Sequence, residues 1–335
     1  MNGQPLEEAQ RSGFVTPPPR KVPGPIIDMH THMVEPARNH ELIEAARLYG
    51  ITKLLAIVEL DEGLALARRW PDEIAVAARP IGREHKRPEP IEHVALRMVH
   101  EAHAHGVRVI KFWFAPRIRD RLDFLLDSPR LDPVFDAIAQ HRMGVLVHVS
   151  DPDRWFERKY DPRKYGTKAD QYPMLEARLR AYPSVPFLGA HMGGDPEHLD
   201  HLGALLRTYP NLYLDTSATK WMVRELGRQR DGARVFFREW AERICFGTDQ
   251  VVVKNPEPHR YPMRYWIHQM FWETDLVCGS PLPDEDSDGP PMLRGLDLPA
   301  DVLEQIYWKN AERAFGISAR PATSSIVAPK TNSTG

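Results

Sequence analysis

Eight short apolar runs, separated by amphipathic helical segments, constrain this chain more than any other feature of its sequence. The runs cover residues 26–32, 53–60, 74–82, 107–114, 144–150, 185–191, 212–215 and 244–249. Apolar runs that alternate with helices indicate parallel strands joined by right-handed crossovers. Their spacing predicts an α/β fold of the TIM type, a (β/α)8 barrel, which needs about 250 residues. The competing fold, an open doubly wound sheet, usually has a glycine-rich phosphate loop after its first strand, where this chain has His-Thr-His.

The first apolar run ends in the motif His30-Thr31-His32. Side chains alternate between the two faces of a strand, so His30 and His32 point the same way. Neutral imidazole is the commonest side-chain ligand of zinc-like metals. The motif therefore predicts half of a metal site, although one such pair is also compatible with ordinary surface histidines.

Ionisable residues also lie at the ends of later runs, namely Lys111, His148, His191 and Asp249. The carboxyl ends of all strands of a barrel converge on one mouth, where active sites are built. Three imidazoles and one carboxylate suit zinc, manganese, iron or nickel. Each histidine alone is compatible with a hydrogen-bonded core side chain, but their joint placement predicts a metal site at the C-terminal mouth.

Lys111 lies inside an otherwise apolar run, and a buried unpaired ammonium is energetically costly. We expect it to bind a substrate carboxylate, to pair with a metal ligand, or to be carbamylated and bridge two metals. Arg117 is a second candidate for holding a substrate anion. Asp215 ends a run as well, but an aspartate there is equally explained as a turn cap. Residues 151–173, which include Trp155, are predicted to form a lid or substrate wall over the mouth, with a plain surface excursion as the equal alternative.

The composition of the chain limits the partners and the location that can be expected for this protein. The formal net charge is −2, which gives no general footprint for nucleic acid or an anionic membrane. No apolar run approaches the roughly 20 residues that span a bilayer. The two cysteines form no disulfide framework, which favours a reducing, cytoplasmic location. Residues 1–24 are predicted to be a disordered Pro-rich leader, 25–317 the barrel, and 318–335 a disordered tail. Residues 266–272 are apolar and predict a core helix, with a subunit interface, hence a homo-oligomer, as the alternative.

Five motifs, taken in order, resemble the amidohydrolase superfamily. They are Ile-Ile-Asp-Met-His-Thr-His, Val-Leu-Val-His-Val, Gly-Ala-His-Met-Gly-Gly, Phe-Gly-Thr-Asp and Trp-Lys-Asn-Ala-Glu-Arg-Ala-Phe-Gly. The chain is most similar to the branch of amidohydrolase-related and aminocarboxymuconate-semialdehyde-decarboxylase-like proteins, over about residues 25–317. The resemblance implies a (β/α)8 barrel in which His30, His32, His148 and Asp249 bind the metal and His191 is catalytic. It also implies one divalent metal, zinc before manganese or iron, and a second metal if Lys111 is carbamylated.

Two departures from the family pattern concern the substrate rather than the metal. Pro36 lies one residue later than the proline that often follows the first motif, and the segment 151–173 is long. The family contains hydrolases, decarboxylases and hydratases, so membership does not determine the reaction.

The first functional hypothesis is a hydrolase of an amide, ester or lactone in a small, anionic substrate. Asp249 would accept the proton of the attacking water, His191 would polarise the carbonyl, and Lys111 or Arg117 would hold the anion, with Trp155 in the substrate wall. The alternative is a nonoxidative decarboxylase of an unsaturated or aromatic acid that uses the same ligands. A non-catalytic metal-binding barrel is the third hypothesis. Its weakness is that structural zinc sites are usually closed and rich in cysteine.

Overall fold

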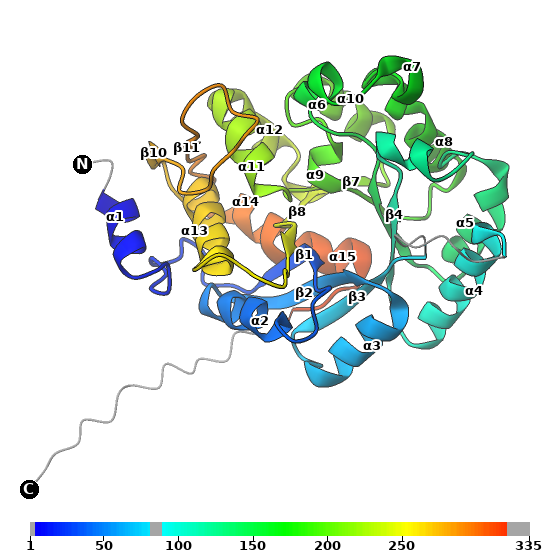
Figure 1. Ribbon diagram of the computed structural model, residues 1–335, viewed down its shortest axis with the longest axis horizontal. Helices are drawn as coiled ribbons and strands as arrows, with labels where there is room; N and C mark the ends of the chain where they lie inside the picture. The colour runs from blue at the N-terminus through cyan, green and yellow to red at the C-terminus, as the bar shows by residue number, and fades with distance from the viewer. Residues whose placement is uncertain (1–3, 81–88, 320–335) are drawn as a thin grey trace, which may run out of the picture.

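A parallel sheet forms the centre of the computed structural model, which describes residues 4–80 and 89–319 (Figure 1). Its strand order is β8-β7-β6-β5-β4-β3-β2-β1-β9, and every pairing within it is parallel. The strands are β1 (Ile26–His32), β2 (Ile51–Val58), β3 (Ile74–Ala78), β4 (Val109–Trp113), β5 (Gly144–His148), β6 (Phe187–Gly189), β7 (Leu212–Asp215), β8 (Ile244–Cys245) and β9 (Gln250–Val251).

The two ends of this sheet meet in one segment of chain. Strand β8 pairs with β7, and β9, which follows a few residues later, pairs with β1. Between them the backbone N–H of Met29 donates to the Phe246 carbonyl (2.9 Å), and that of Asp249 donates to the His30 carbonyl (2.8 Å). The sheet is therefore curled into a TIM-barrel-like form, and the predicted parallel α/β class is confirmed.

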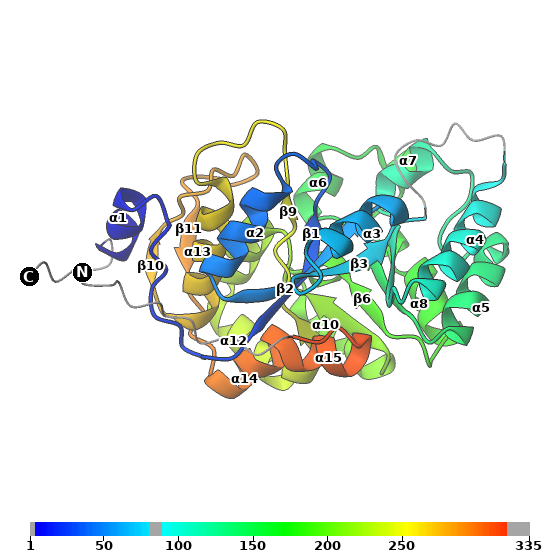
Figure 2. The ribbon, with the colours of Figure 1, turned by 90° about the horizontal axis from the view of Figure 1, so that it is seen from below.

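Helices cover the outside of the sheet, as the two perpendicular ribbon views show (Figures 1 and 2). The main ones are α2 (Asn39–Leu48), α3 (Leu60–Arg69), α4 (Ile91–Ala104), α5 (Asp132–Gln140), α8 (Pro173–Ala181), α10 (Leu199–Thr208), α12 (Arg230–Glu239) and α13 (Arg260–Glu273). Gly50 and Gly106 follow α2 and α4 with φ of 73° and 76°, the left-handed conformation that ends a helix.

Shorter elements connect the main ones or lie over the sheet. They are α6 (Asp153–Arg158), α7 (Pro162–Tyr165), α9 (Ala190–Gly193), α11 (Thr219–Trp221), η1 (Pro116–Asp120), η2 (Pro129–Leu131), η3 (Ala169–Gln171), η4 (Met222–Leu226) and η5 (Ala241–Arg243). The last helical stretch, 300–315, consists of α14 (Ala300–Glu304), the π-helical η6 (Gln305–Lys309) and α15 (Asn310–Phe315). Inside the curl, the apolar residues Ile27, Leu55, Val109, Leu146 and Leu188 form a buried core.

Segment 280–299 is not the plain linker that its acidic, Pro-rich sequence indicates. Strands β10 (Val277–Gly279) and β11 (Met292–Arg294) pair antiparallel and enclose a loop of acidic residues. Ion pairs attach this loop to the body of the protein, for example Lys220 Nζ to Glu285 Oε2 (3.1 Å) and Lys159 Nζ to Asp286 Oδ1 (3.0 Å). The two partners of each ion pair are far apart in sequence and leave no local pattern, which explains why the attachment of this loop was not predicted.

A disordered leader is predicted for residues 1–24, and the structure of the described part, 4–24, differs from that prediction. Helix α1 (Gln4–Arg11) is followed by Phe14, which is buried and lies edge-to-face with Trp266 (ring centroids 5.7 Å apart). The Tyr49 hydroxyl donates to the Phe14 carbonyl (2.7 Å), and the backbone N–H of Lys21 donates to Glu273 Oε2 (2.7 Å). Tertiary contacts thus order a segment whose composition indicates disorder. The predicted tail lies, from residue 320 onward, outside the described residues.

Phe14→Ala tests this anchoring. Removing a buried phenylalanine from a core costs about 3 kcal/mol or more, and a terminal segment can detach, so we expect the free energy of unfolding to fall by about 2 kcal/mol. Denaturant unfolding followed by circular dichroism measures the change. Val15→Ala is the matched control because Val15 is 53% exposed. Equal stability of the two variants would contradict the packing.

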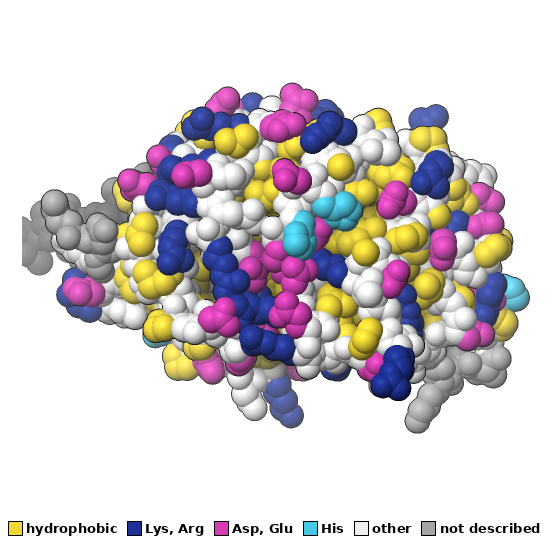
Figure 3. Space-filling model, turned by 90° about the horizontal axis from the view of Figure 1, so that it is seen from above, with side chains coloured by type: hydrophobic (Ala, Val, Ile, Leu, Met, Phe, Trp, Pro, Cys, Tyr) yellow, Lys and Arg dark blue, Asp and Glu magenta, His cyan; other side chains and the backbone are white. Residues whose placement is uncertain are grey.

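Two surface findings complete the fold. Within the described ranges, no helix combines the length and the apolar composition that crossing a bilayer requires. On the face drawn in Figure 3, lysine and arginine side chains are interspersed with acidic ones. The predicted core helix over 266–272 is part of α13, and its Trp266 and Trp272 are buried.

Candidate metal centre

Three donor side chains from three strand ends come together at the mouth of the curled sheet. One ligand atom each from His30, His191 and Asp249 lies within 4.8 Å of the others. The His30 and His191 rings are stacked with centroids 4.8 Å apart, and His30 Nε2 is 3.5 Å from Asp249 Oδ1. Residues separated by more than 200 positions in sequence thus face one small volume, as the strand-end pattern predicts.

The other two predicted ligands border this group. His32 Nε2 lies 3.2 Å from Asp249 Oδ1, so both histidines of the first motif face the same carboxylate. The His148 ring is perpendicular to that of His191, with centroids 4.6 Å apart. Its Nε2 is 3.0 Å from the Ser150 carbonyl and 3.1 Å from Asp151 Oδ1. These contacts place all five residues around one small volume, and His191, for which the resemblance implies a catalytic role, is itself one of the three clustered donors.

Left-handed backbone conformations turn the key side chains into the site. His191, Met192, Ala218 and Asp249 have φ values of 58°, 53°, 66° and 56°. Such conformations cost about 1 kcal/mol or more for residues with a Cβ, and they cluster at functional sites. The cost is offset here by hydrogen bonds, since the His191 N–H donates to Asp215 Oδ1 (2.7 Å).

Asp215 is the buried carboxylate that organises the centre. Its Oδ2 lies 2.8 Å from His30 Nδ1, and its Oδ1 accepts from the backbone N–H of Ser217 (3.0 Å) and from the Ser217 hydroxyl. Burial opposes its ionisation, but the attraction of His30 and the hydrogen bonds hold its pKa below the usual range. Because an ionised carboxylate only accepts, His30 Nδ1 carries the proton and Nε2 is left with a lone pair facing the site.

The same reasoning fixes the tautomer of His191. The Ser217 hydroxyl has one proton, which it gives to Asp215, so its oxygen accepts from His191 Nδ1 at 2.7 Å. The Nε2 atom of His191 is then unprotonated as well. Burial, followed by the field of His148, holds the pKa of His191 well below its ordinary value. Asp215 thus prepares two imidazole lone pairs, whereas the sequence suggested only a turn cap for it.

Asp28 ties the first strand to the strand end that carries Asp249. It is fully buried and accepts from the N–H of His30 (3.2 Å), the N–H of Thr248 (3.0 Å) and the Thr248 hydroxyl (2.6 Å). Burial raises its pKa to about 7. At Gly247, a Cβ would lie 3.2 Å from the Cβ of His30, so this glycine allows the close approach that its place in the sequence indicates. The network fixes His30 and Asp249 relative to each other.

Cationic groups surround the centre. Lys111 is buried, and its Nζ has no hydrogen-bond partner in the part of the chain that the structure describes. Burial lowers its pKa to about 8, against the fields of Asp215 and Asp249. On α13, burial lowers the pKa of Arg264 to about 10, and Asp249 partly opposes that shift. Arg264 carries no motif in the sequence, so it could be found only from the fold.

Arg117 and Trp155 lie farther out than Lys111. Arg117 is exposed on η1, with its guanidinium carbon 6.0 Å from the centre of the Tyr160 ring. The Tyr160 hydroxyl donates to Asp151 Oδ2 (2.5 Å), and Asp151 contacts His148. Arg117 thus reaches the centre only through other side chains.

Trp155 belongs to an aromatic wall over the centre. Its ring lies 5.5 Å from that of Trp221, and Trp221 lies 5.1 Å from His191. The sequence pointed to Trp155 but not to Trp221, which follows β7 on helix α11. Segment 151–173 is fastened to the loop after α9, since Lys168 Nζ is 2.8 Å from both Asp153 Oδ1 and Asp195 Oδ1.

The donor set fits a divalent metal. Imidazole nitrogens with one carboxylate are the ligands of zinc and related ions. The lone pairs of His30 and His191 and the Asp249 carboxylate face one small volume, while Asp215 orients both rings from behind. Hydrogen-bonded partners of this kind are typical of metal-binding histidines.

Comparison with known proteins gives a match to one family model. The family model described as Amidohydrolase matches residues 27–317. No curated protein matches the sequence. Three solved structures illustrate the shared fold, and at their low identities the similarity shows the fold alone.

The first of these is 5-carboxyvanillate decarboxylase from Sphingomonas paucimobilis, with 14% identity, a TM-score of 0.50, and coverage of 88% of this chain and 99% of that one. The second is a probable 2-pyrone-4,6-dicarboxylic acid hydrolase from Acinetobacter baumannii, with 12% identity, a TM-score of 0.51, and coverage of 87% of this chain and 99% of that one. The third is the 4-oxalomesaconate hydratase from Rhodopseudomonas palustris, with 12% identity, a TM-score of 0.50, and coverage of 87% of this chain and 95% of that one.

Proposed function

This chain belongs to the amidohydrolase family, and from that premise we propose that it is a metal-dependent hydrolase of an amide, ester or lactone in a small anionic molecule. The observation that carries the proposal is the meeting of His30, His191 and Asp249 within 4.8 Å. A buried cation, Lys111, beside these donors supports a carboxylate on the substrate.

The proposed ligands are His30, His32, His148 and Asp249, and zinc is the proposed metal. When bound, a divalent metal supplies Lewis acidity, which polarises oxygen and lowers the pKa of water. Asp249 accepts the proton of the attacking water and returns it to the leaving group. His191 faces the same space, but a polarising role would need a proton on its Nε2, which the contact with Ser217 and the lowered pKa withhold. We therefore propose that its ring positions the substrate beside Asp249. Lys111 and Arg264 hold the anionic group, and Trp155 and Trp221 form the wall that limits the entry of water.

The roles of His148 and His191 can be separated by metal content. We expect His148→Asn to lower the metal bound per chain, whereas His191→Asn retains it and loses turnover. Elemental analysis of both purified variants, compared with the wild type, measures this. Metal lost from the His191 variant and kept in the His148 variant would reverse the assignment. One metal per chain in the wild type is expected; two would indicate that Lys111 is carbamylated.

A decarboxylase is the second candidate, because the same cations accept the carboxylate of an acid that loses CO₂. The named acids of the three structural neighbours, 5-carboxyvanillate, 2-pyrone-4,6-dicarboxylic acid and 4-oxalomesaconate, are themselves anionic. The deciding experiment assays the metal-loaded enzyme against esters, lactones and amides of carboxylic acids and, in parallel, measures CO₂ release from unsaturated and aromatic acids. Hydrolysis without CO₂ supports the proposal, CO₂ release replaces it, and inertness in both assays would indicate a non-catalytic metal-binding protein.

A further inference from the structure

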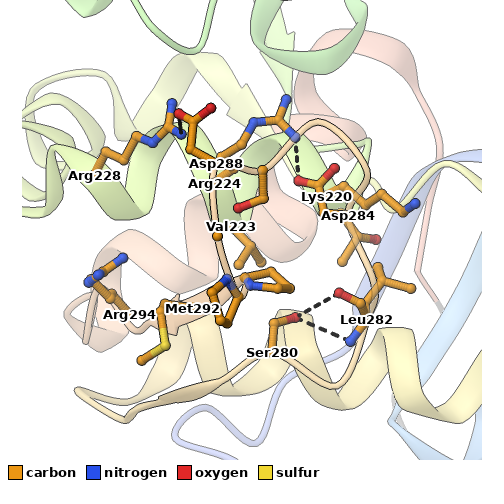
Figure 4. A pocket seen from close by; sticks show the side chains of 15 residues that line it. Lys220, Val223, Arg224, Arg228, Ser280, Leu282, Asp284, Asp288, Met292 and Arg294 are labelled. Atoms are coloured by element: carbon orange, nitrogen blue, oxygen red, sulfur yellow. Dashed lines mark hydrogen bonds and ion pairs between the residues drawn. The ribbon is translucent and has the colours of Figure 1, made fainter.

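A second pocket lies apart from the metal centre. It is formed between η4 and the β10–β11 hairpin and has an empty volume of about 670 Å³, part of it open to solvent (Figure 4). Its lining includes Thr219 and Lys220, whereas Trp221, the next residue, contacts His191. Helix α11 therefore separates the pocket from the metal centre, and none of the five predicted site residues lines it.

The pocket combines an apolar wall with a charged rim. The apolar side chains are Val223, Leu282, Pro290, Pro291 and Met292. The rim carries four cations and two carboxylates, namely Lys220, Arg224, Arg228, Arg294, Asp284 and Asp288. Pockets of this size with apolar walls and a few polar groups are typical small-molecule sites. The excess of cations indicates an anionic ligand.

Arg294 is the cation that is free to bind such a ligand. Lys220 pairs with Glu285 (3.1 Å), Arg224 pairs with Asp284, and Arg228 pairs with Glu225 (3.2 Å). Across residues 4–80 and 89–319, the structure gives Arg294 neither a side-chain hydrogen bond nor an ion pair. Figure 4 shows Arg294 beside Met292 at one end of the pocket, away from the ion pair of Arg224 with Asp284.

The buried part of the rim has spare donor capacity as well. Arg224 is 6% exposed, and its Nη2 atom has no hydrogen-bond partner among the described residues. A buried guanidinium nitrogen without a partner is costly, because it has lost water and gained nothing in return. The pocket thus contains a half-buried arginine, Arg294, and a second arginine, Arg224, whose donors are not all used.

We propose that this pocket binds a small carboxylate that carries an aromatic ring or a branched apolar chain. The guanidinium of Arg294 would take the carboxylate, for which its planar fork is suited. The ring or chain would lie against Val223, Met292 and the two prolines. A purely inorganic anion such as phosphate would leave that apolar wall uncovered, so the apolar part of the ligand is expected to contribute to affinity.

Benzoate, with neutral benzamide as its isosteric partner, is the probe for this site. Isothermal titration calorimetry on the full chain should show that benzoate binds more tightly than benzamide. Arg294→Gln should weaken benzoate binding about tenfold, the loss expected for one charge-assisted contact, and leave benzamide unchanged. Arg238→Gln is the matched control, because Arg238 is exposed on α12 outside the pocket lining. Met292→Glu, which places a carboxylate beside Arg294, should weaken benzoate binding independently.

A third variant distinguishes this pocket from the metal centre, which is also expected to bind anions. Lys111→Met removes the buried cation of that centre, and the event that depends on Arg294 should persist in it. Benzoate binding that is unchanged in both Arg294→Gln and Met292→Glu, or that disappears only in Lys111→Met, would overturn the proposal. Neither result bears on whether the metal centre hydrolyses its substrate, so the two proposals fail separately.

Discussion

Asp249→Asn is expected to lower turnover about a thousandfold while most of the metal stays bound. General acid–base catalysis contributes about 10²- to 10⁴-fold, and the amide cannot accept a proton from water. It keeps the size of the carboxylate and an oxygen donor, and the histidines remain to hold the ion. Steady-state kinetics and elemental analysis on the same preparation measure both quantities.

The control for this variant is Asp231→Asn. The Asp231 side chain is 98% exposed on α12, so the same chemical change there should alter neither rate nor metal content. Normal turnover in Asp249→Asn would end the proposed role of Asp249 as proton acceptor. Loss of the metal together with the rate would mean that Asp249 acts first as a ligand, and its role as a base would then need a different test.

The strand ends of the site could be predicted because two simple rules connect sequence to position. Alternation along a strand places His30 and His32 on one face, and parallel strands in a closed sheet bring His148, His191 and Asp249 to the same mouth. Neither rule depends on side-chain detail. In the structure the two histidines of the first motif, His30 and His32, both face Asp249.

The partners behind these residues could not be predicted in the same way. Asp215 reads as a turn cap because local sequence shows only its own strand end. Its bonds to His30 and His191 depend on the left-handed turn at His191 and on the packing of β6 against β7. Arg264 comes from a helix with no motif, and it reaches the centre only because α13 follows β9, the strand that begins directly after Asp249.

Amino-acid composition led to wrong expectations for two segments that tertiary contacts hold in place. The segment around Phe14 is rich in proline and charge, yet one buried aromatic ring and a few carbonyl groups attach it to α13. The loop between β10 and β11 reads as a linker, but its carboxylates meet basic side chains on α6, α11 and η4. Such pairings are invisible to periodicity, since each partner alone has the pattern of a solvated surface.

Asp215→Asn is expected to weaken metal binding by about 10- to 100-fold, the range for partners that orient metal-binding histidines. The carboxylate keeps the proton on His30 Nδ1, which is 2.8 Å away. An amide can present its N–H₂ instead, which favours the other tautomer and puts the proton on Nε2, where the metal should bind. Asp215 thus acts as a positioning residue, so its replacement should lower the affinity for metal more than it lowers the stability of the metal-free protein.

Competition against a chelating dye measures metal affinity of the Asp215 variant, and thermal unfolding of the metal-free protein measures stability. Asp215→Glu, which restores a carboxylate acceptor, should recover part of the affinity, whereas Asp231→Asn should lose none. If Asp215→Asn lowers the stability of the metal-free protein but binds metal as tightly as the wild type, the carboxylate holds the fold together without preparing the lone pairs of His30 and His191. Weaker binding with unchanged stability is the result that the geometry of Asp215, buried between the two imidazoles, leads us to expect.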